Sequence, residues 1–184
     1  SVTPVSSNGW TGQPVESEPK QIKWDLNWYD EFDYESADGG KAPFTDKWVA
    51  ENSRQGHILS GRYHKNVEVS DGVLKLKQFH EDPPVNGQDW TAGSVNSKAK
   101  LGYGYYEARY KYAAAAGLNN SFWIYSQHAG GPGPHYEIDM NEGHYPRSIN
   151  SNIQSSAVGV KENNNYRPDY VETMADDFHT FEME

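Results

Sequence analysis

The stretch NVEVSDGVLKLKQF, residues 66–79, has the pattern of a β-hairpin. Val67 and Val69 alternate with polar residues, so their side chains share one face of a first strand. Asp71-Gly72 suits a tight two-residue turn. The apolar run after that turn continues to Leu76 and predicts the returning strand. Residues 66–79 therefore predict antiparallel β-structure.

The chain on the C-terminal side of this hairpin keeps the same alternation. In GYGYYEARYKYAA, residues 102–114, one face carries Tyr106, Ala108, Tyr110 and Tyr112 and the other face carries charged residues. Further short strands are predicted in NSFWIYS (120–126), HYEIDMNE (135–142), RSINSNIQSSAV (147–158) and FHTFEME (178–184). Loops are predicted in AAAAGLNN (113–120), QHAGGPGPH (127–135) and KENNNYRPDY (161–170). This succession of strands and turns predicts an all-β fold, an antiparallel β-sandwich.

Length and composition bound the organisation of the chain. Its 184 residues suit one domain with a real core. The first residues are rich in Ser, Pro, Gly and Glu and cannot bury enough surface to order themselves, so we predict a flexible leader at 1–20 and one domain at 21–184. Aromatic residues make up 14% of a chain whose mean hydropathy is -0.91. Rings in so hydrophilic a chain suit strands and flat sugar-stacking surfaces.

Charge and residue content argue against several functions. The net charge of -10 and the pI near 5.1 argue against nucleic acid as a partner, because a phosphate backbone needs a cationic face. No apolar run approaches the roughly 20 residues of a membrane-spanning helix. The lack of Cys excludes disulfides and thiol catalysis but leaves export open. The histidines have no metal-ligand spacing, so no metal site is predicted from them.

Three acids lie close together in the segment 135–142. Glu137 and Asp139 are two residues apart and share a strand face, whereas strict alternation sends Glu142 to the other face. A β-bulge between Asp139 and Glu142 restores the parity, and we predict one there. Ile138 and Met140, which alternate with the acids, are expected to face the core. Acids this close repel one another and raise a pKa, which is useful for acid–base chemistry.

This arrangement suits glycoside hydrolysis with retention of configuration. The reaction needs two carboxyl groups about 5–5.5 Å apart, one an ionised nucleophile and the other a protonated general acid. Strand neighbours supply that spacing, and a third carboxylate between them can share a proton. We predict Glu137 as nucleophile, Asp139 as its assistant and Glu142 as acid/base. The alternative is a solvated acidic strand face, which the nearby Trp123 and Tyr125 disfavour.

The sequence resembles glycoside hydrolase family 16. EIDMNE, residues 137–142, matches the E-x-D-x-x-E signature of the family in its bulged-strand form, which is found in laminarinases, agarases, porphyranases and carrageenases. WYDEFDYES (28–36) resembles the opening strand of the family and NVEVSDGVLKLK the hairpin that follows. TAGSVNSKAKLGYGYYEARYKY (91–112) resembles the run before the active-site strands, and DDFHTFEME (176–184) the start of a later core strand. The resemblance extends from Trp28 to Glu184.

The resemblance implies a fold and a mechanism. The fold is a concanavalin-like β-jelly-roll of two curved antiparallel sheets with the substrate cleft on the concave face. The mechanism is endo-acting and retaining, through a glycosyl-enzyme intermediate, and the three acids keep the roles given above. No cofactor is required, and a structural calcium near Asp30 to Asp33 is compatible with the family pattern. The resemblance also implies a bacterial protein that is secreted, periplasmic or on the outer cell surface.

Further residues are expected to contact substrate. Trp123 matches the family's Trp in the strand beside the acids, where it would floor a subsite. His144 lies two residues beyond Glu142, and Gln154 stands where the family commonly has a His. The segments that border the cleft in relatives contribute a stacking candidate and three cationic candidates: Trp90, Arg54, Arg62 and His64. The ordinary alternatives are a core Trp, a surface-loop His and solvated charges.

The resemblance also sets an expectation for the end of the domain. The family domain normally continues for several strands beyond the point that Glu184 matches. We therefore expect this chain to lack the C-terminal strands of the jelly-roll. An incomplete sandwich exposes strand edges and apolar faces, so we expect the missing segment, in some form such as a second chain, to be a partner.

The expected substrate is a polysaccharide. LNNSFWIYS, residues 118–126, lacks the Trp-Pro that precedes this strand in most β-glucan cleavers, which favours red-algal β-galactans such as agarose or porphyran. A laminarin-type β-1,3-glucan is the alternative substrate, and transglycosylation is an alternative outcome of the same intermediate. A non-catalytic carbohydrate-binding jelly-roll is the alternative class of protein. The acid triad favours an enzyme, because a binding module has no need for three like charges on one face.

Overall fold

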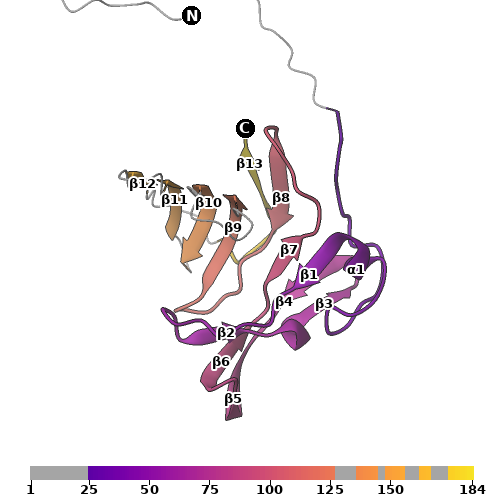
Figure 1. The fold of residues 1–184 in the computed structure, drawn as a ribbon, viewed down its shortest axis with the longest axis vertical. Helices are drawn as coiled ribbons and strands as arrows, with labels where there is room; N and C mark the ends of the chain where they lie inside the picture. The colour runs from indigo at the N-terminus through magenta and orange to yellow at the C-terminus, as the bar shows by residue number, and fades with distance from the viewer. Residues whose placement is uncertain (1–24, 127–135, 145–147, 156–161, 167–173) are drawn as a thin grey trace, which may run out of the picture. The chain divides into compact units, whose positions relative to one another are not determined.

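The computed structural model describes residues 25–126, 136–144, 148–155, 162–166 and 174–184 (Figure 1). The leader predicted at 1–20 and the loop predicted at 127–135 lie outside these ranges. The chain divides into two compact units, Ser1–Gly102 and Tyr103–Glu184. The predicted all-β class is confirmed, since α1 (Phe44–Lys47) is the only α-helix in the described ranges. With four residues it is far too short to cross a membrane.

The strands of the N-terminal unit pair into small sheets. After α1 the elements are β1 (Trp48–Ala50), β2 (Ser60–Arg62), the 3-10 helix η1 (His64–Asn66), β3 (Val67–Ser70), β4 (Val73–Leu76), β5 (Gln78–Val85), β6 (Gln88–Ala92) and β7 (Val95–Ser97). The pairs β1–β7, β3–β4 and β5–β6 are antiparallel. The pair β2–β6 departs from the prediction because it is parallel.

The hairpin predicted at residues 66–79 is confirmed as β3 and β4. Val67 pairs with Leu76 in an antiparallel register. The turn residues Asp71 and Gly72 have φ angles of 56° and 72°, the left-handed backbone that a two-residue hairpin turn of this type requires. Val67 and Val69 are both buried, so the face predicted from their alternation is the face that packs into the core.

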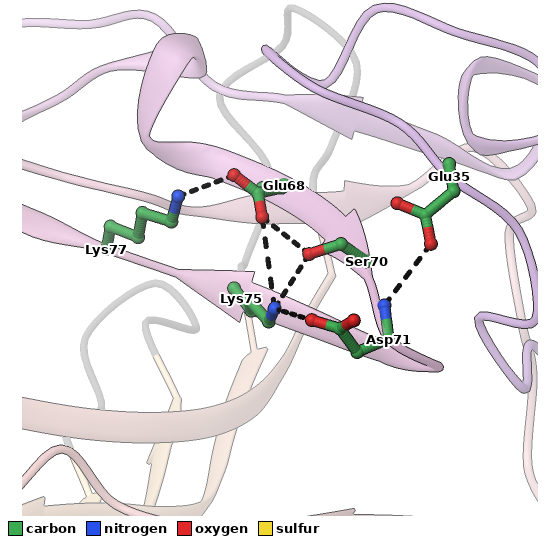
Figure 2. Close-up of polar contacts among 6 residues, drawn as sticks. All are labelled: Glu35, Glu68, Ser70, Asp71, Lys75 and Lys77. Carbon is green, nitrogen blue, oxygen red and sulfur yellow. Dashed lines mark hydrogen bonds and ion pairs between the residues drawn. The ribbon is translucent and has the colours of Figure 1, made fainter.

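The opposite face of the hairpin carries charged side chains (Figure 2). Lys75 Nζ donates to Ser70 Oγ at 2.7 Å and to Asp71 Oδ2 at 2.6 Å. Lys77 Nζ donates to Glu68 Oε2 at 2.5 Å. Solvent and salt screen ion pairs as exposed as these, so they contribute little to stability. The buried valines therefore contribute more to holding the hairpin than the charges do.

The segment WYDEFDYES does not form the opening strand that the resemblance implied. Residues 25–35 contain no strand, and Phe32 has a φ of 57°, which no extended strand can accommodate. The reason lies in Asp30, whose side chain is 2% exposed. Its carboxylate accepts hydrogen bonds from Trp48 Nε1 at 2.7 Å, Tyr34 Oη at 2.8 Å and Phe32 N at 3.1 Å. The bond from Phe32 N turns the backbone around the carboxylate.

Asp30 thereby connects this segment to the core of the N-terminal unit. That core consists of Phe44, Val67 and Val69 with Phe32, Tyr34, Trp48, Ala50, Leu74 and Val95 around them. Burial alone would raise the pKa of Asp30, but the hydrogen bonds from Trp48, Tyr34 and Phe32 and the charge of Lys47 outweigh it and hold the pKa below its ordinary value of 3.8.

The C-terminal unit contains a four-stranded and a two-stranded antiparallel sheet. Its strands are β8 (Tyr106–Tyr110), β9 (Asn119–Ser126), β10 (Tyr136–His144), β11 (Ser148–Ser155), β12 (Glu162–Tyr166) and β13 (His179–Met183). The larger sheet has the order β12-β11-β10-β9, and β13 pairs with β8 (Figure 1). The loop predicted in AAAAGLNN is confirmed for residues 113–118, which contain a turn at 116 and 117, but Asn119 and Asn120 already belong to β9.

The loop predicted at 161–170 is wrong for residues 162–166, which form β12. Ser151 of β11 pairs with Tyr166 and Ser155 with Glu162. The loop was predicted from the polarity of this segment, because an asparagine-rich segment has few of the residues that favour strands. The segment forms a strand because the edge of β11 has backbone N–H and C=O groups that need partners, and the backbone of a polar segment can provide them.

The interior of the C-terminal unit is built on tyrosines. The alternation predicted for residues 106–112 is confirmed, with Tyr110 partly buried and Tyr112 only 2% exposed. Phe181 of β13 stacks on Tyr110 with ring centroids 4.6 Å apart. Tyr112, Ile149 and Met174 form the buried cluster. The two-stranded sheet β8–β13 therefore supplies aromatic side chains to one face of the larger sheet.

We expect Asp30→Asn to lower the free energy of unfolding at pH 7 by about 1–3 kcal/mol, because an amide cannot accept three hydrogen bonds and carry a charge for Lys47. Urea denaturation measures this loss. Asp33→Asn is the matched control, since Asp33 is exposed in the same segment. The folded pKa of Asp30 is depressed, so the difference from wild type should shrink as the pH falls below 3.8. Equal stability of the two variants at pH 7 contradicts the role given to Asp30.

Candidate active site

The strand β10 departs from regular pairing where the sequence predicts a bulge. Asp139 pairs with Trp123 of β9, and Asn141 pairs with Phe122. Because Trp123 and Phe122 are consecutive, Met140 is an extra residue without a partner on β9. The register with β11 also shifts between Asp139 and Glu142. The predicted β-bulge is confirmed.

The bulge brings the three acids to one face of the sheet. The β9 partners of Glu137, Asp139 and Glu142 are Tyr125, Trp123 and Ser121. These partners are spaced two residues apart, so they share a face of β9. Directly paired residues on neighbouring strands lie on the same face. The three carboxylates therefore lie on the face that carries Trp123 and Tyr125.

Asp139 is the most enclosed of the three acids, with 3% of its surface exposed. On β11 its paired residue is Asn152, and Gln154 pairs with Glu137. Asn152 Nδ2 donates to Asp139 Oδ2 at 3.3 Å, and Gln154 Nε2 makes a longer contact with the same oxygen at 3.5 Å. Gln154, predicted to bind substrate, thus contacts an acid in this structure. Substrate binding by Gln154 stays a prediction.

Glu142 receives its hydrogen bond from β9, whereas the donors to Asp139 come from β11. Asn119 Nδ2 in β9 donates to Glu142 Oε1 at 2.9 Å. The residue paired with Glu142 on β11 is Asn150. The carboxylate of Glu142 is partly exposed, so it can reach a ligand above the sheet while one oxygen is held.

Glu137 has a strongly altered acidity. Burial is the largest cause, followed by the charge of Asp139, a hydrogen bond with Asp139 and the charge of Glu142, and together these raise the pKa of Glu137 from 4.5 to about 7. The contribution from Glu142 means that the third acid lies close enough to interact with the first. Glu137 therefore takes up a proton near neutral pH.

Two aromatic rings lie beside the acids. Trp123 is partly buried and Tyr125 is 44% exposed. Their ring centroids are 5.8 Å apart with an interplanar angle of 70°. A partly exposed Trp ring can pack against the apolar face of a sugar. The surface therefore combines carboxyl groups that can exchange protons with an aromatic surface suited to a glycan.

The interior face of β10 differs from the prediction. Ile138 pairs with Ile124 and lies on the face opposite the acids, as expected. Met140 was expected to face the core as well, but it is the bulged residue. Asn141 takes the interior position opposite Phe122 and is 0% exposed. Side-chain alternation could not predict that Asn141 is the interior residue, because it assigns that position to Met140. Alternation along one strand also contains no information about partners in another sheet.

The remaining predicted substrate contacts are divided between the two units of the chain. Trp90, Arg54, Arg62 and His64 belong to the N-terminal unit, and a place for them in the same cleft stays a prediction. Arg62 forms an ion pair with Glu51. The Trp90 ring packs edge-on against His80 at 4.9 Å. His144 is the last residue of β10, paired with Asn119.

The described residues contain no group of three His, Cys, Asp or Glu side chains that could hold a metal ion. Asp30, which lies in the segment where a calcium is compatible with the family pattern, uses its carboxylate to accept hydrogen bonds from Trp48 and Tyr34. Calcium binding stays a prediction.

Sequence reasoning missed the amide residues that surround the acids. Asn119, Asn152 and Asn150 were absent from the predicted site. A signal for two of them was present, because Asn150, Asn152 and Gln154 recur at a spacing of two in SINSNIQS and must share a face. Asn119 carried no such signal, since only the register of β9 against β10 brings it to Glu142.

Comparison with known proteins supports the resemblance. The family model of glycosyl hydrolases family 16 matches residues 52–184. An endo-1,3-1,4-beta-glycanase, ExoK, of Rhizobium meliloti (strain 1021) is 35% identical over 102 residues, which are 53% of this chain and 36% of the relative. The chain thus spans about a third of the length of this curated relative.

We expect Glu137→Gln to raise the melting temperature at pH 8 but not at pH 4. Between the ordinary pKa of 4.5 and the folded pKa of about 7, the folded protein binds more protons at Glu137 than the unfolded chain does. Stability therefore falls as the pH rises through this window, and the amide variant does not share that loss. Calorimetry across the pH range measures the difference.

Glu31→Gln is the control for this comparison, because Glu31 is exposed and its substitution removes the same charge. A stabilisation by Glu137→Gln that is the same at every pH, or that Glu31→Gln reproduces, contradicts the raised pKa.

Proposed function

Because the chain belongs to glycosyl hydrolases family 16, we propose that it cleaves internal β-glycosidic bonds of a polysaccharide with retention of configuration. The observation that carries this proposal is the bulge that brings Glu137, Asp139 and Glu142 to one face beside Trp123. Three like charges on one face cost stability, and such a cost is expected where the charges serve a reaction. A retaining glycosidase needs such carboxyl groups.

The proposed reaction has two steps. In the first, Glu142 protonates the glycosidic oxygen while Glu137 attacks the anomeric carbon, so the leaving sugar departs and a glycosyl-enzyme ester forms. In the second, Glu142 removes a proton from water, which attacks the same carbon and releases Glu137. Each step inverts the configuration, so the product retains it.

Asp139 accounts for how a residue of raised pKa can act as a nucleophile. The Glu137–Asp139 pair shares a hydrogen bond, and a proton held by the pair can reside on either carboxyl. When the proton resides on Asp139, Glu137 is the ionised partner and points its other oxygen at the sugar. The contacts from Asn152 and Gln154 to Asp139 Oδ2 hold that oxygen, which favours a proton on the other oxygen, toward Glu137.

We propose a red-algal β-galactan of the agarose or porphyran type as the substrate, on the strength of the sequence around Trp123. A β-glycan with 1,3- and 1,4-linkages is the second candidate, supported by the endo-1,3-1,4-beta-glycanase relative. A β-1,3-glucan of the laminarin type is the third. A polymer of this size does not cross a membrane, so we also propose that the protein acts outside the cytoplasm, which cell fractionation tests.

A product-release screen with the full protein separates the substrates. Agarose, porphyran, carrageenan, laminarin and lichenan cover the three linkage classes. We expect new reducing ends from agarose or porphyran, with internal cleavage seen as an early loss of viscosity. Release from lichenan alone favours the 1,3-1,4-linked glycan instead, and release from none of the polymers counts against hydrolysis.

The roles of the two glutamates are tested by azide rescue with an activated aryl glycoside. We expect Glu137→Gln to bind the polysaccharide but release no product, because no ester can form. Azide should restore turnover in Glu137→Ala with inversion, since it attacks the sugar directly. In Glu142→Ala it should do so with retention, since it attacks the ester. Retained product from Glu137→Ala reverses the assignment of the two glutamates. If the protein is a binding module, neither the wild type nor any variant releases product.

A further inference from the structure

A buried polar cluster lies directly behind the bulge of β10, on the face opposite the acids. Asn141 Nδ2 donates to Tyr110 Oη at 2.5 Å, and Tyr112 Oη donates to Asn141 Oδ1 at 2.7 Å. Asn141 is 0% exposed and Tyr112 is 2% exposed. The amide therefore has a partner on each side in a region that excludes water. We call Asn141, Tyr110 and Tyr112 the bulge cluster.

Gly143 shows that β10 is shaped around the same tyrosine. Gly143 lies two residues beyond Asn141, so the two positions share the interior face. A Cβ atom on Gly143 would lie 2.1 Å from Tyr112 Cζ, a distance that no side chain tolerates. The tip of Tyr112 thus occupies the space where a side chain at 143 would lie. Position 143 leaves room for the phenol and position 141 binds its hydroxyl.

The bulge cluster chooses between two placements of the bulge. In the observed placement Met140 is the extra residue, and Asn141 takes the interior position opposite Phe122. In the alternative, Met140 takes the interior position and Asn141 is extra. Hydrophobicity alone favours the alternative, because burying an amide is costly and burying a Met is favourable. The hydroxyl groups of Tyr110 and Tyr112 offset the cost of burying the Asn141 amide. If Met140 took the interior position, both hydroxyl groups would lose their hydrogen-bond partner.

The two placements differ in where the backbone carries Glu142. Moving the extra residue changes the path of the chain between Asp139 and Glu142, next to the carboxyl group that must reach the glycosidic oxygen. Tyr110 supports the cluster as a neutral hydroxyl that accepts the bond from Asn141, because burial and the neighbouring Tyr112 raise its pKa above the usual range although that bond lowers it. The phenol does not ionise near neutral pH.

We propose that Asn141, held by Tyr110 and Tyr112, is a positioning residue that selects the bulge placement and so sets Glu142 relative to Glu137 and Asp139. This role rests on the proposed glycosidase function. It assigns a specific task to a buried amide that touches no substrate. The interior of the C-terminal unit then controls the geometry of the acids through the backbone of β10.

The first test is Asn141→Leu, which keeps the branching and the number of side-chain heavy atoms but removes both hydrogen bonds. Because Leu and Met suit the interior equally, the two bulge placements become comparable. We expect kcat to fall roughly 10- to 100-fold, the size of loss that a misplacement of about 1 Å produces, while KM stays close to that of the wild type. Ile149→Val is the control, since it loosens the same buried cluster without removing a polar contact. We expect it to leave kcat unchanged.

The second test separates positioning from simple stability. In the triple variant Tyr110→Phe, Tyr112→Phe and Asn141→Leu the bulge cluster no longer contains a hydroxyl or amide that has lost its partner, so much of the lost melting temperature should return. We expect kcat to stay low, because no interaction selects the observed placement. Return of both quantities together shows that the cluster only stabilises the fold and overturns the proposal.

A third readout needs no activity. The pKa of Glu137, measured by NMR of labelled glutamate side chains, includes a contribution from the charge of Glu142. We expect this pKa to fall in Asn141→Leu and to stay unchanged in Ile149→Val. A wild type that cleaves no glycan refutes the proposed function, while the NMR comparison still decides whether the cluster sets the acids. An active wild type with normal kcat and Glu137 pKa in Asn141→Leu refutes the cluster's role alone.

Discussion

Face parity along β10 is the constraint on which the candidate site depends. A strand sends successive side chains to opposite faces, so acids at an odd separation cannot meet on one surface. Met140 adds the one residue that turns Glu142 to the face of Glu137 and Asp139. The amides of β11 and the rings of β9 follow from the same register, because pairing on both sides of β10 fixes which of their side chains share that face.

The bulge has a cost that the rest of the unit offsets. An unpaired residue interrupts the ladder of β10. Burial, together with the repulsion of the acids that the bulge gathers, raises the pKa of Glu137 to about 7. On the other face, Tyr110 and Tyr112 satisfy the buried amide of Asn141, and Phe181 stacks on Tyr110. Polar contacts and packing on the interior face of the sheet thus accompany repulsion between carboxylates on the face that carries the acids. This is the distribution expected where a fold gives up stability for function.

In the N-terminal unit a buried carboxylate stabilises the fold. Asp30 is buried like Asp139, but its neighbours are donors and a lysine rather than other carboxylates. Its pKa is therefore held down, whereas that of Glu137 is raised. Burial acts in the same direction on both acids, and the sign of the net shift is decided by the partners. A carboxyl group surrounded by donors stabilises a fold, and one surrounded by carboxyls is available for proton transfer.

The sequence alone determined the hairpin of residues 66–79, the alternation of β8 and the need for a bulge between Asp139 and Glu142. Each of these follows from the period of two that the pleated backbone imposes on neighbouring residues. Tertiary structure alone decided that Met140 is the extra residue, that Phe32 leaves the extended conformation and that residues 162–166 pair with β11. In each case the deciding partner lies far away in the chain or on another element: Tyr112 for Asn141, Trp48 for Asp30 and the free edge of β11 for β12. Local periodicity carries no information about such partners, because they meet only when the chain folds.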